Sequence, residues 1–319
     1  MTFLQGQFSA DIAALGTDRA TLTAHSNRQG RAFCTALVWA DDAAVMLQLP
    51  ATQADDTLAR LKMYVLRSRV ELSIAGNALA PAALWDDPAG ILPTDEWTVG
   101  QDGDGRPAVR LPGTVPRWLT VGPADAGDDG RWRFEDVRAG LPQVYPETRE
   151  QFLPQALNLD ALDGISFEKG CYVGQEVIAR LHFRGTVKRR MRPFALPATA
   201  TLPSPGDELR ASGETAGKVV DAARYGDDAV LLAVCPINAP LDDCRLPDVT
   251  PLRALDLPYS LPSSSASAPA SPSAPSSGRK CGNSSTSRID GASEKSITSR
   301  SIPTPSPPVG GNPYSSART

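Results

Sequence analysis

The spacing of hydrophobic and polar residues predicts a mixture of helices and strands in the first part of the chain. Residues 36–39 and 45–49 are apolar runs separated by a pair of aspartates, a pattern typical of a β-hairpin. Residues 55–66 repeat apolar side chains at intervals of three and four, which predicts an amphipathic helix. Residues 70–74 then alternate apolar and polar side chains, which predicts a strand with one buried face.

The pattern farther along the chain is less regular at first and then becomes strand-like. Residues 78–130 are rich in Pro, Gly and Asp, which predicts loops joined by short elements. Residues 174–183 carry apolar side chains at helical spacing after a glycine, and we expect Gly185 to end that helix. Beyond Pro205, short apolar runs separated by Gly and Asp predict a small β-barrel or sandwich.

These patterns predict an α+β body followed by a compact all-β unit and a tail. We place the α+β region at residues 1–192, a C-terminal β-barrel at 193–262 and a disordered tail at 263–319. The tail holds 18 Ser and 8 Pro in 57 residues and contains no Leu, Phe or Trp. It therefore cannot bury enough apolar surface to offset its chain entropy. The tail carries a charge of +4, which leaves −8 on residues 1–262.

Composition and cysteine spacing exclude several classes of protein. No apolar run approaches the roughly 18 residues that a membrane span needs, and the first residues lack the features of a signal peptide. The five cysteines are widely spaced, without a C-x-x-C pair, and there are only two histidines. We therefore expect neither a self-contained metal site nor a disulfide framework. The sequence predicts a cytoplasmic protein with reduced thiols and no membrane partner.

Cys171 stands in the setting that favours a reactive thiol. It lies two residues after Lys169 and shortly before a predicted helix, and both a cation and a helix N-terminus stabilise a thiolate. Gly170 and Gly174 allow positive φ or the close approach of a ligand. The residues alone also allow a plainer interpretation, in which Cys171 is a buried small hydrophobe and Glu176 caps the helix.

A longer block of sequence surrounds these residues. It comprises residues 152–160, 164–167 and the segment Lys169-Gly170-Cys171-Tyr172-Val173-Gly174-Gln175-Glu176, hereafter the KGCYVGQE segment, and it continues through residues 179–185. This block resembles the YgfZ-type folate-binding proteins, which are related to the glycine-cleavage T-protein and to mitochondrial factors that mature iron–sulfur proteins. Weaker matches lie at Phe3-Leu4-Gln5-Gly6-Gln7, in the glycine-centred loop 27–31 and at residues 257–261, so the resemblance covers residues 3–261.

The resemblance implies a fold and a role. The expected fold has T-protein-like modules arranged around a central channel, closed on one side by the C-terminal β-barrel. The expected ligand is tetrahydrofolate or a derivative. The family role is support of iron–sulfur client proteins, with an indirect link to tRNA-modifying enzymes. We therefore expect a monomeric accessory protein without independent catalytic activity.

The resemblance also implies roles for individual residues. Lys169 and Cys171 correspond to the motif's functional Lys and Cys, flanked by Tyr172, Gly174, Gln175 and Glu176. Trp132 aligns with a tryptophan implicated in ligand contact, and an aromatic face suits a flat pterin. Arg138 occupies the position before an Ala-Gly pair where the glycine-cleavage enzyme carries an acidic residue that holds the pterin. The family also has a strand ahead of the Phe3 motif, which we expect to be missing here.

A basic strip follows the KGCYVGQE segment and leaves two alternatives open. An RNA backbone or a polyglutamylated folate tail would suit it, although it is equally consistent with a solvated strand edge. The alternatives are thus a folate-dependent aminomethyl transferase, against which Arg138 argues, and an RNA-binding module that uses residues 182–192. The strip consists of His182, Arg184, Lys188, Arg189, Arg190 and Arg192.

Overall fold

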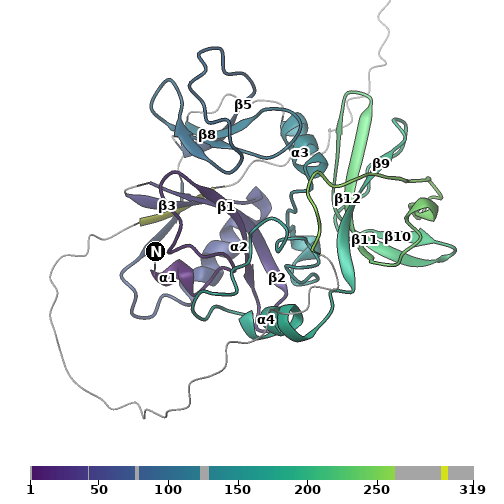
Figure 1. Cartoon of the computed structure of the whole chain (residues 1–319), viewed down its shortest axis with the longest axis horizontal. Helices are drawn as coiled ribbons and strands as arrows, with labels where there is room; N and C mark the ends of the chain where they lie inside the picture. The colour runs from purple at the N-terminus through teal and green to yellow at the C-terminus, as the bar shows by residue number, and fades with distance from the viewer. Residues whose placement is uncertain (1, 42, 76–78, 123–128, 263–295, 301–319) are drawn as a thin grey trace, which may run out of the picture.

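A computed structural model describes residues 2–41, 43–75, 79–122, 129–262 and 296–300 of the chain. These residues form a mixed α/β fold with three β-sheets (Figure 1). The predicted disordered tail lies outside the described residues except for one short strand at 296–300.

The first sheet contains the predicted hairpin and strand. Its order is β1-β2-β3-β14-β4. The hairpin is confirmed, because β2 and β3 pair antiparallel, and all nine residues of β2 are buried. The tail strand β14 pairs parallel with β3 on one side and with β4 on the other. The elements of this region are α1 (Thr2–Gln5), β1 (Ala20–Ser26), β2 (Ala32–Ala40), β3 (Ala44–Gln48), α2 (Ala51–Lys62), β4 (Glu71–Ile74) and β14 (Ser296–Arg300).

The predicted helix at 55–66 is real but lies four residues earlier. It begins directly after Pro50, whose fixed φ is compatible with a helix start, and it ends at Lys62. Leu61 is buried, whereas Leu58 and Val65 are partly buried against the same core. The apolar stripe thus located the buried face of the helix but not its ends.

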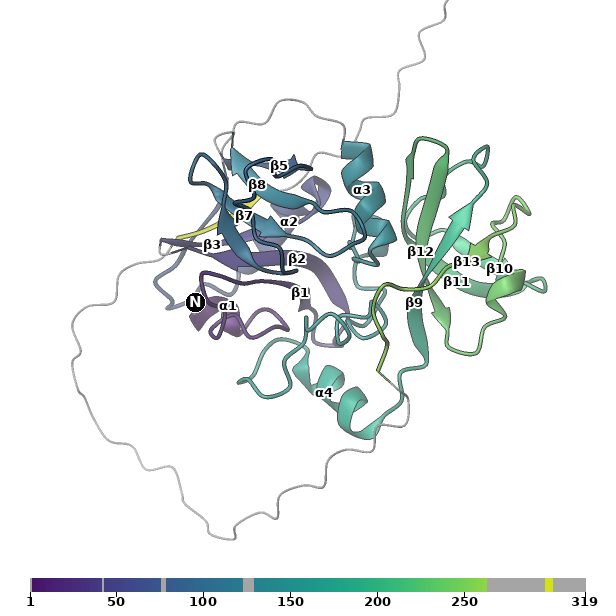
Figure 2. The same cartoon turned by 45° about the horizontal axis from the view of Figure 1, so that its top comes forward.

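The second sheet lies in the segment for which the sequence pattern was least regular. Its four strands are antiparallel in the order β5-β8-β7-β6. A helix that the sequence did not predict, α3, follows this sheet and lies between it and the C-terminal sheet (Figures 1 and 2). The elements are β5 (Ala80–Leu84), β6 (Val99–Gln101), β7 (Pro107–Arg110), β8 (Trp118–Gly122) and α3 (Asp129–Arg138).

The third sheet is antiparallel throughout, in the order β10-β11-β12-β9-β13. Isolated bridges from Arg210 to Arg245 and from Arg245 to Pro251 extend its pairing from β10 toward the segment before β13. The first strand begins at Arg189, slightly before the predicted boundary at residue 193. The elements are η2 (Pro146–Thr148), α4 (Gln175–Arg184), β9 (Arg189–Leu196), β10 (Glu208–Ala211), β11 (Glu214–Tyr225), β12 (Asp228–Pro236), η3 (Leu241–Asp243) and β13 (Arg253–Ala254).

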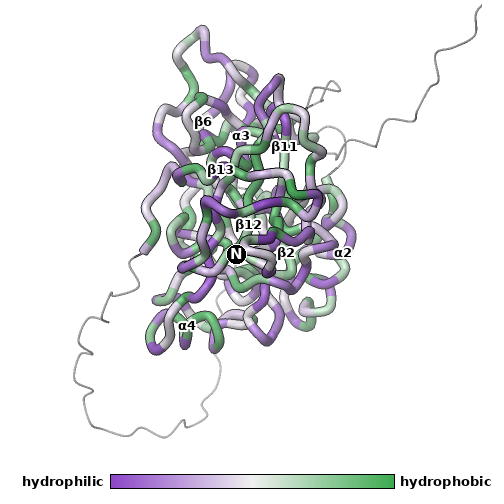
Figure 3. The backbone as a smooth tube through the Cα atoms, turned by 90° about the vertical axis from the view of Figure 1, so that its right-hand side faces the viewer, coloured by the Kyte–Doolittle hydropathy of each residue, from purple (hydrophilic) through white to green (hydrophobic). Residues whose placement is uncertain are grey.

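The largest core cluster joins the first sheet, α3, α4 and the third sheet. It contains residues of β1, α3, the irregular segment 152–172, α4 and the third sheet. Figure 3 shows hydrophobic and hydrophilic stretches alternating along the backbone of these elements. The KGCYVGQE segment therefore contributes, through Tyr172, to a core shared by the first and third sheets.

Candidate functional site

Two of the motifs found in the sequence lie against one another in the structure. The Ser166 N–H donates to the Ser9 carbonyl at 2.9 Å, and the Ser9 hydroxyl donates to the Gly164 carbonyl at 2.6 Å. The Val173 N–H donates to the Gly6 carbonyl at 3.2 Å. The N-terminal motif and the KGCYVGQE region, more than 150 residues apart in the sequence, thus form one hydrogen-bonded unit.

The ammonium group of Lys169 is the centre of this unit. Its Nζ donates to the carbonyls of Gln5 at 2.7 Å, Phe8 at 2.6 Å and Ala10 at 2.7 Å, which uses all three of its protons. It also lies 4.7 Å from the centroid of the Tyr172 ring. Burial lowers the pKa of Lys169 to about 8, so the group is protonated at neutral pH. Lys169 therefore holds the N-terminal segment against the backbone that carries Cys171.

Cys171 is the exposed cysteine of the described chain. Cys34, Cys235 and Cys244 are buried, whereas the Cys171 thiol is open to solvent. A partner molecule can therefore reach this sulfur, as a nucleophilic or ligating thiol requires. Its reactivity stays a prediction, and the plainer interpretation as a buried hydrophobe is wrong.

The two glycines of the segment have different local roles. Gly174 has φ of 83°, and a Cβ there would lie 2.5 Å from the Asn27 carbonyl oxygen and 3.0 Å from the Gly30 Cα. The glycine-centred loop 27–31 therefore packs directly on the start of α4. Gly170, by contrast, has no heavy atom within 4 Å of such a Cβ and no positive φ, so the fold itself does not demand a glycine there.

The remaining residues of the segment prepare the start of α4. The side-chain oxygen of Gln175 accepts the Tyr172 N–H at 3.3 Å, and the exposed Glu176 lies in the first turn, where a carboxylate favours the helix dipole. Burial raises the pKa of Tyr172 to about 12. The helix runs from Gln175 to Arg184 with Gly185 as its C-cap, which confirms the sequence prediction.

Two buried amides connect the preceding block to the rest of the molecule. The Gln155 side chain donates to the Ile178 carbonyl at 2.7 Å, and the Asn158 side chain donates to the Met191 carbonyl at 2.9 Å. Asn158 has φ of 61°, a conformation that asparagine tolerates better than most residues. This irregular segment is therefore fixed by side chains rather than by regular secondary structure.

Trp132 and Arg138, the two residues proposed for ligand contact, lie on α3 away from the KGCYVGQE segment. Trp132 is buried, edge-on to Trp85 at 5.9 Å, with the Arg117 guanidinium 4.8 Å from its ring centroid. It does not line either of the two cavities described below. Arg138 is half exposed, lies 3.8 Å from Glu135 and points into a cavity. The ligand-contact role of Trp132 stays a prediction.

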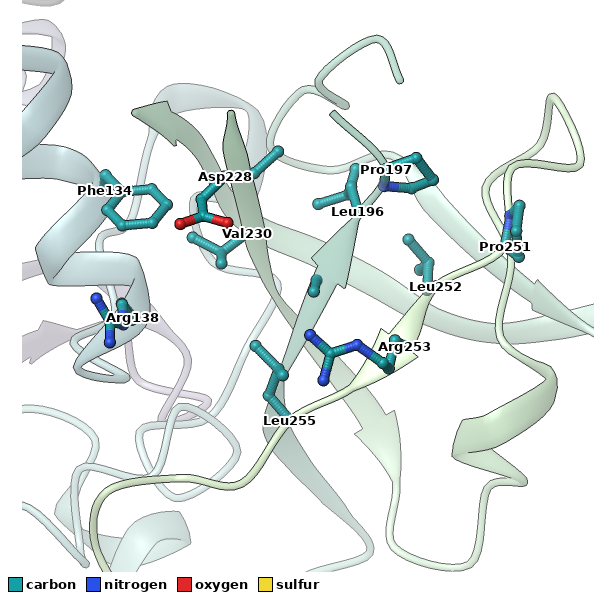
Figure 4. A pocket seen from close by; sticks show the side chains of 12 residues that line it. Phe134, Arg138, Leu196, Pro197, Asp228, Val230, Pro251, Leu252, Arg253 and Leu255 are labelled. Atoms are coloured by element: carbon teal, nitrogen blue, oxygen red, sulfur yellow. The ribbon is translucent and has the colours of Figure 1, made fainter. Parts of the chain in front are cut away.

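The larger cavity lies between α3 and the third sheet and has a volume of about 560 Å³ (Figure 4). Its lining combines two guanidinium groups, Arg138 and Arg253, with one carboxylate, Asp228, and apolar side chains. In Figure 4 Arg138 projects from α3, whereas Arg253 and Leu255 come from the β13 segment. The apolar lining comprises Phe134, Ala195, Leu196, Pro197, Ala229, Val230, Pro251, Leu252 and Leu255.

A smaller cavity, of about 260 Å³, adjoins the Lys169 unit. It is lined by polar residues of both hydrogen-bonded motifs, including Asp11 and Ser166, and by Arg19, Trp97 and Asp163. Sites for drug-sized ligands occupy about 300–1,000 Å³, so only the larger cavity has the volume for such a ligand.

The predicted basic strip needs one correction. Arg190 is buried and forms a two-pronged ion pair with Asp160, at 2.5 and 2.9 Å, so it does not belong to a basic surface. The sequence could not reveal this, because the partner lies thirty residues away. Arg180, which was not part of the strip, is exposed on α4 beside Arg184.

Buried charges on α3 were also missed by the sequence analysis. Arg117, fully buried, pairs with Asp136 at 2.8 Å. Arg133 and the Tyr145 hydroxyl both donate to Asp221 of β11, at 2.8 Å each. The only signal in the sequence was the unusual density of charged residues around Trp132. These pairs fix α3 between the second and third sheets and so shape the larger cavity.

Comparison with known proteins identifies relatives over most of the chain. A "tRNA-modifying protein YgfZ" from Serratia proteamaculans is 33% identical over 296 residues, covering 81% of this chain and 87% of that protein. A protein of the same name from Klebsiella pneumoniae is 32% identical over 287 residues, with the same coverage. The chain belongs to the YgfZ family.

The YgfZ assignment confirms the resemblance inferred from the KGCYVGQE segment. No family model matches the chain. The glycine cleavage system aminomethyltransferase T from Bartonella henselae, a solved structure, aligns over 80% of this chain and 79% of that protein, with 13% identity and a TM-score of 0.48. That likeness is too distant to inform the fold or function of this YgfZ-family chain. In the described part of the chain, no helix is long and apolar enough to cross a bilayer.

Proposed function

We propose that this chain is a folate-binding accessory protein that supports iron–sulfur cluster assembly or repair in tRNA-modifying enzymes, without independent catalytic activity. Its YgfZ relatives carry the name of tRNA-modifying proteins. The site supports a role that depends on one accessible thiol, because Cys171 is exposed on a backbone that Lys169 fixes through three carbonyls. This arrangement is the observation that carries the proposal.

The larger cavity has the chemistry that a tetrahydrofolate needs. Its apolar walls suit a flat heterocycle, Asp228 can accept hydrogen bonds from the pterin ring, and Arg138 and Arg253 can pair with the glutamate carboxylates. A bound tetrahydrofolate would carry one-carbon units on its nitrogens. The modular ring around a channel, with the C-terminal β-barrel closing one side of it, is a further part of this proposal.

Aminomethyl transfer is not the function that the site favours. Arg138, which lines the larger cavity, occupies the position where the glycine-cleavage enzyme carries the acidic residue that holds the pterin. Among the described residues, no group of three His, Cys, Asp or Glu side chains could hold a metal ion either. We therefore place the working chemistry at the Cys171 thiol and in the partner protein, in the cytoplasm.

The folate part is tested by titrating the full chain with tetrahydrofolate mono- and triglutamate. Arg138→Gln and Arg253→Gln should each weaken binding by about tenfold, the equivalent of roughly 1.4 kcal/mol for a charged contact. Arg180→Gln, an exposed arginine of α4 outside the cavity, is the matched control and should bind normally. Equal affinity in all three variants would remove the ligand from this cavity.

A further inference from the structure

Helix α4 stands out from the body of the protein. It lies at the lower edge of the molecule in Figures 1 and 2, and Ile178 is its one fully buried residue. In Figure 3 it carries hydrophobic and hydrophilic stretches at the edge of the tube. Phe183 follows Ile178 by five positions and therefore lies off the buried face, with 52% of its surface exposed. An aromatic ring so exposed needs an explanation other than core packing.

The exposed ring belongs to a preformed aromatic cluster. His182 stacks on Phe167 with ring centroids 3.7 Å apart and an interplanar angle of 14°. Phe183 packs edge-on against both, at 5.9 Å from Phe167 and 4.8 Å from His182. The Phe183 ring is thus held in place by its neighbours while one side remains open, as a stacking platform requires.

Exposed basic residues precede and follow His182 and Phe183 of this cluster in the sequence. Four basic residues here are exposed, and within the described part of the chain none of them forms an ion pair: Arg180, Arg184, Lys188 and Arg189. The segment 167–189 holds five Lys/Arg and two Asp/Glu, Glu168 and Glu176, so its net charge is +3 although residues 1–262 carry −8. We call this surface the α4 face; it consists of Phe167, Arg180, His182, Phe183, Arg184, Lys188 and Arg189.

We propose that the α4 face binds an unpaired segment of RNA, with a base stacked on Phe183 and phosphates on Arg180, Arg184 and Lys188. Stacking on aromatic rings combined with phosphate contacts is how proteins bind single-stranded RNA and RNA loops. Phe and Arg are also enriched at protein interfaces, so a protein partner is the competing occupant that the experiments below distinguish from RNA. The inference rests on the proposed role in tRNA modification and assigns to it a direct RNA contact.

The test is binding of a labelled single-stranded RNA, an unmodified tRNA transcript and a duplex of equal length to the full chain at several salt concentrations. Phe183→Ala should weaken binding to single-stranded RNA by about 5- to 140-fold without changing the salt slope. The double variant Arg180→Gln/Arg184→Gln should reduce the slope of log K against log salt by about 1.4, since each phosphate contact contributes about 0.7.

A second exposed patch provides the matched control. Leu66 is 86% exposed beside the exposed Arg67 and Arg69, so it offers one apolar and two basic side chains without an aromatic cluster. Leu66→Ala and Arg67→Gln/Arg69→Gln should leave RNA binding unchanged. Equal losses in both patches, or duplex binding as tight as single-strand binding, would overturn the proposal.

A failure of the RNA inference can be distinguished from a failure of the proposed function. Arg180→Gln/Arg184→Gln should keep normal tetrahydrofolate affinity and thermal stability. If the parent chain restores iron–sulfur enzyme activity but binds no RNA at low salt, the RNA inference fails and the accessory role stands. If Phe183→Ala then abolishes that restoration, the α4 face belongs to a protein partner instead.

Discussion

Two glycines of the KGCYVGQE segment should respond in opposite ways to the same substitution. Gly174→Ala places a Cβ at φ of 83° and 2.5 Å from the Asn27 carbonyl oxygen. The left-handed conformation costs an alanine roughly 1–2 kcal/mol, and overpacking against fixed backbone adds about 1–3 kcal/mol. We therefore expect a loss of about 3 kcal/mol in the free energy of unfolding. At 2–4 °C per kcal/mol, the melting temperature should fall by roughly 6–12 °C.

Gly170→Ala is the control four residues away. Its Cβ would meet nothing within 4 Å, so stability should stay unchanged or rise by about 0.4–1 kcal/mol through the less flexible unfolded chain. Urea unfolding and thermal melting followed by circular dichroism would measure both variants. Equal melting temperatures for the two would refute the packing of loop 27–31 on the start of α4. Loss of activity in a stable Gly170→Ala protein would show that a partner approaches this open space.

Four further substitutions, at Lys169, Asp221, Tyr145 and His25, test the surrounding structure. Lys169→Met should lower the free energy of unfolding by about 1–3 kcal/mol, because the carbonyls of Gln5 and Phe8 lose their hydrogen-bond donor and have no other described partner. This loss exceeds the free energy gained by no longer burying the ammonium group. An unchanged urea midpoint would contradict this prediction. Asp221→Ala should cost about 3 kcal/mol, since Arg133 and Tyr145 lose their acceptor, and Tyr145→Phe should cost only about 1 kcal/mol by calorimetry. Burial lowers the pKa of His25 from 6.5 to about 4. As pH falls from 6.5 to 4, His25 therefore takes up a proton in the unfolded chain before it does so in the folded protein. The free energy of unfolding should decrease over this range by up to about 3 kcal/mol. His25→Gln should flatten this part of the pH profile, and a profile identical to that of the parent chain would contradict the assignment.

The sequence predicted those helices and strands whose apolar side chains all lie on one buried face. The β2–β3 hairpin, α2, β4 and α4 were found for this reason, with errors of a few residues at their ends. Helix α3 was missed because Glu135 and Asp136 are buried beside Trp132 and Val137, which removes the contrast between a polar and an apolar face. Burial of charge depends on partners such as Arg117, whose position no local pattern reveals.

The candidate site shows the same division between local and long-range information. The KGCYVGQE segment and its family could be identified from the residues alone. The role of Lys169 could not, because its three acceptors lie about 160 residues away in the sequence. The sequence placed this cation as the neighbour that activates Cys171, whereas its protons are all directed to the N-terminal carbonyls. Arg190 was assigned to a basic surface for the corresponding reason, since Asp160 is not adjacent to it in the sequence.

The most direct test of the account concerns the thiol of Cys171. The full chain and its Cys171→Ala and Cys171→Ser variants would be expressed in cells that lack their own YgfZ protein, and the activity of an iron–sulfur-dependent tRNA-modifying enzyme would be measured. Because Cys171 is exposed, neither substitution should change the melting temperature. We expect that the parent chain restores the activity and that both stable variants fail to do so. Full restoration by Cys171→Ala would contradict it.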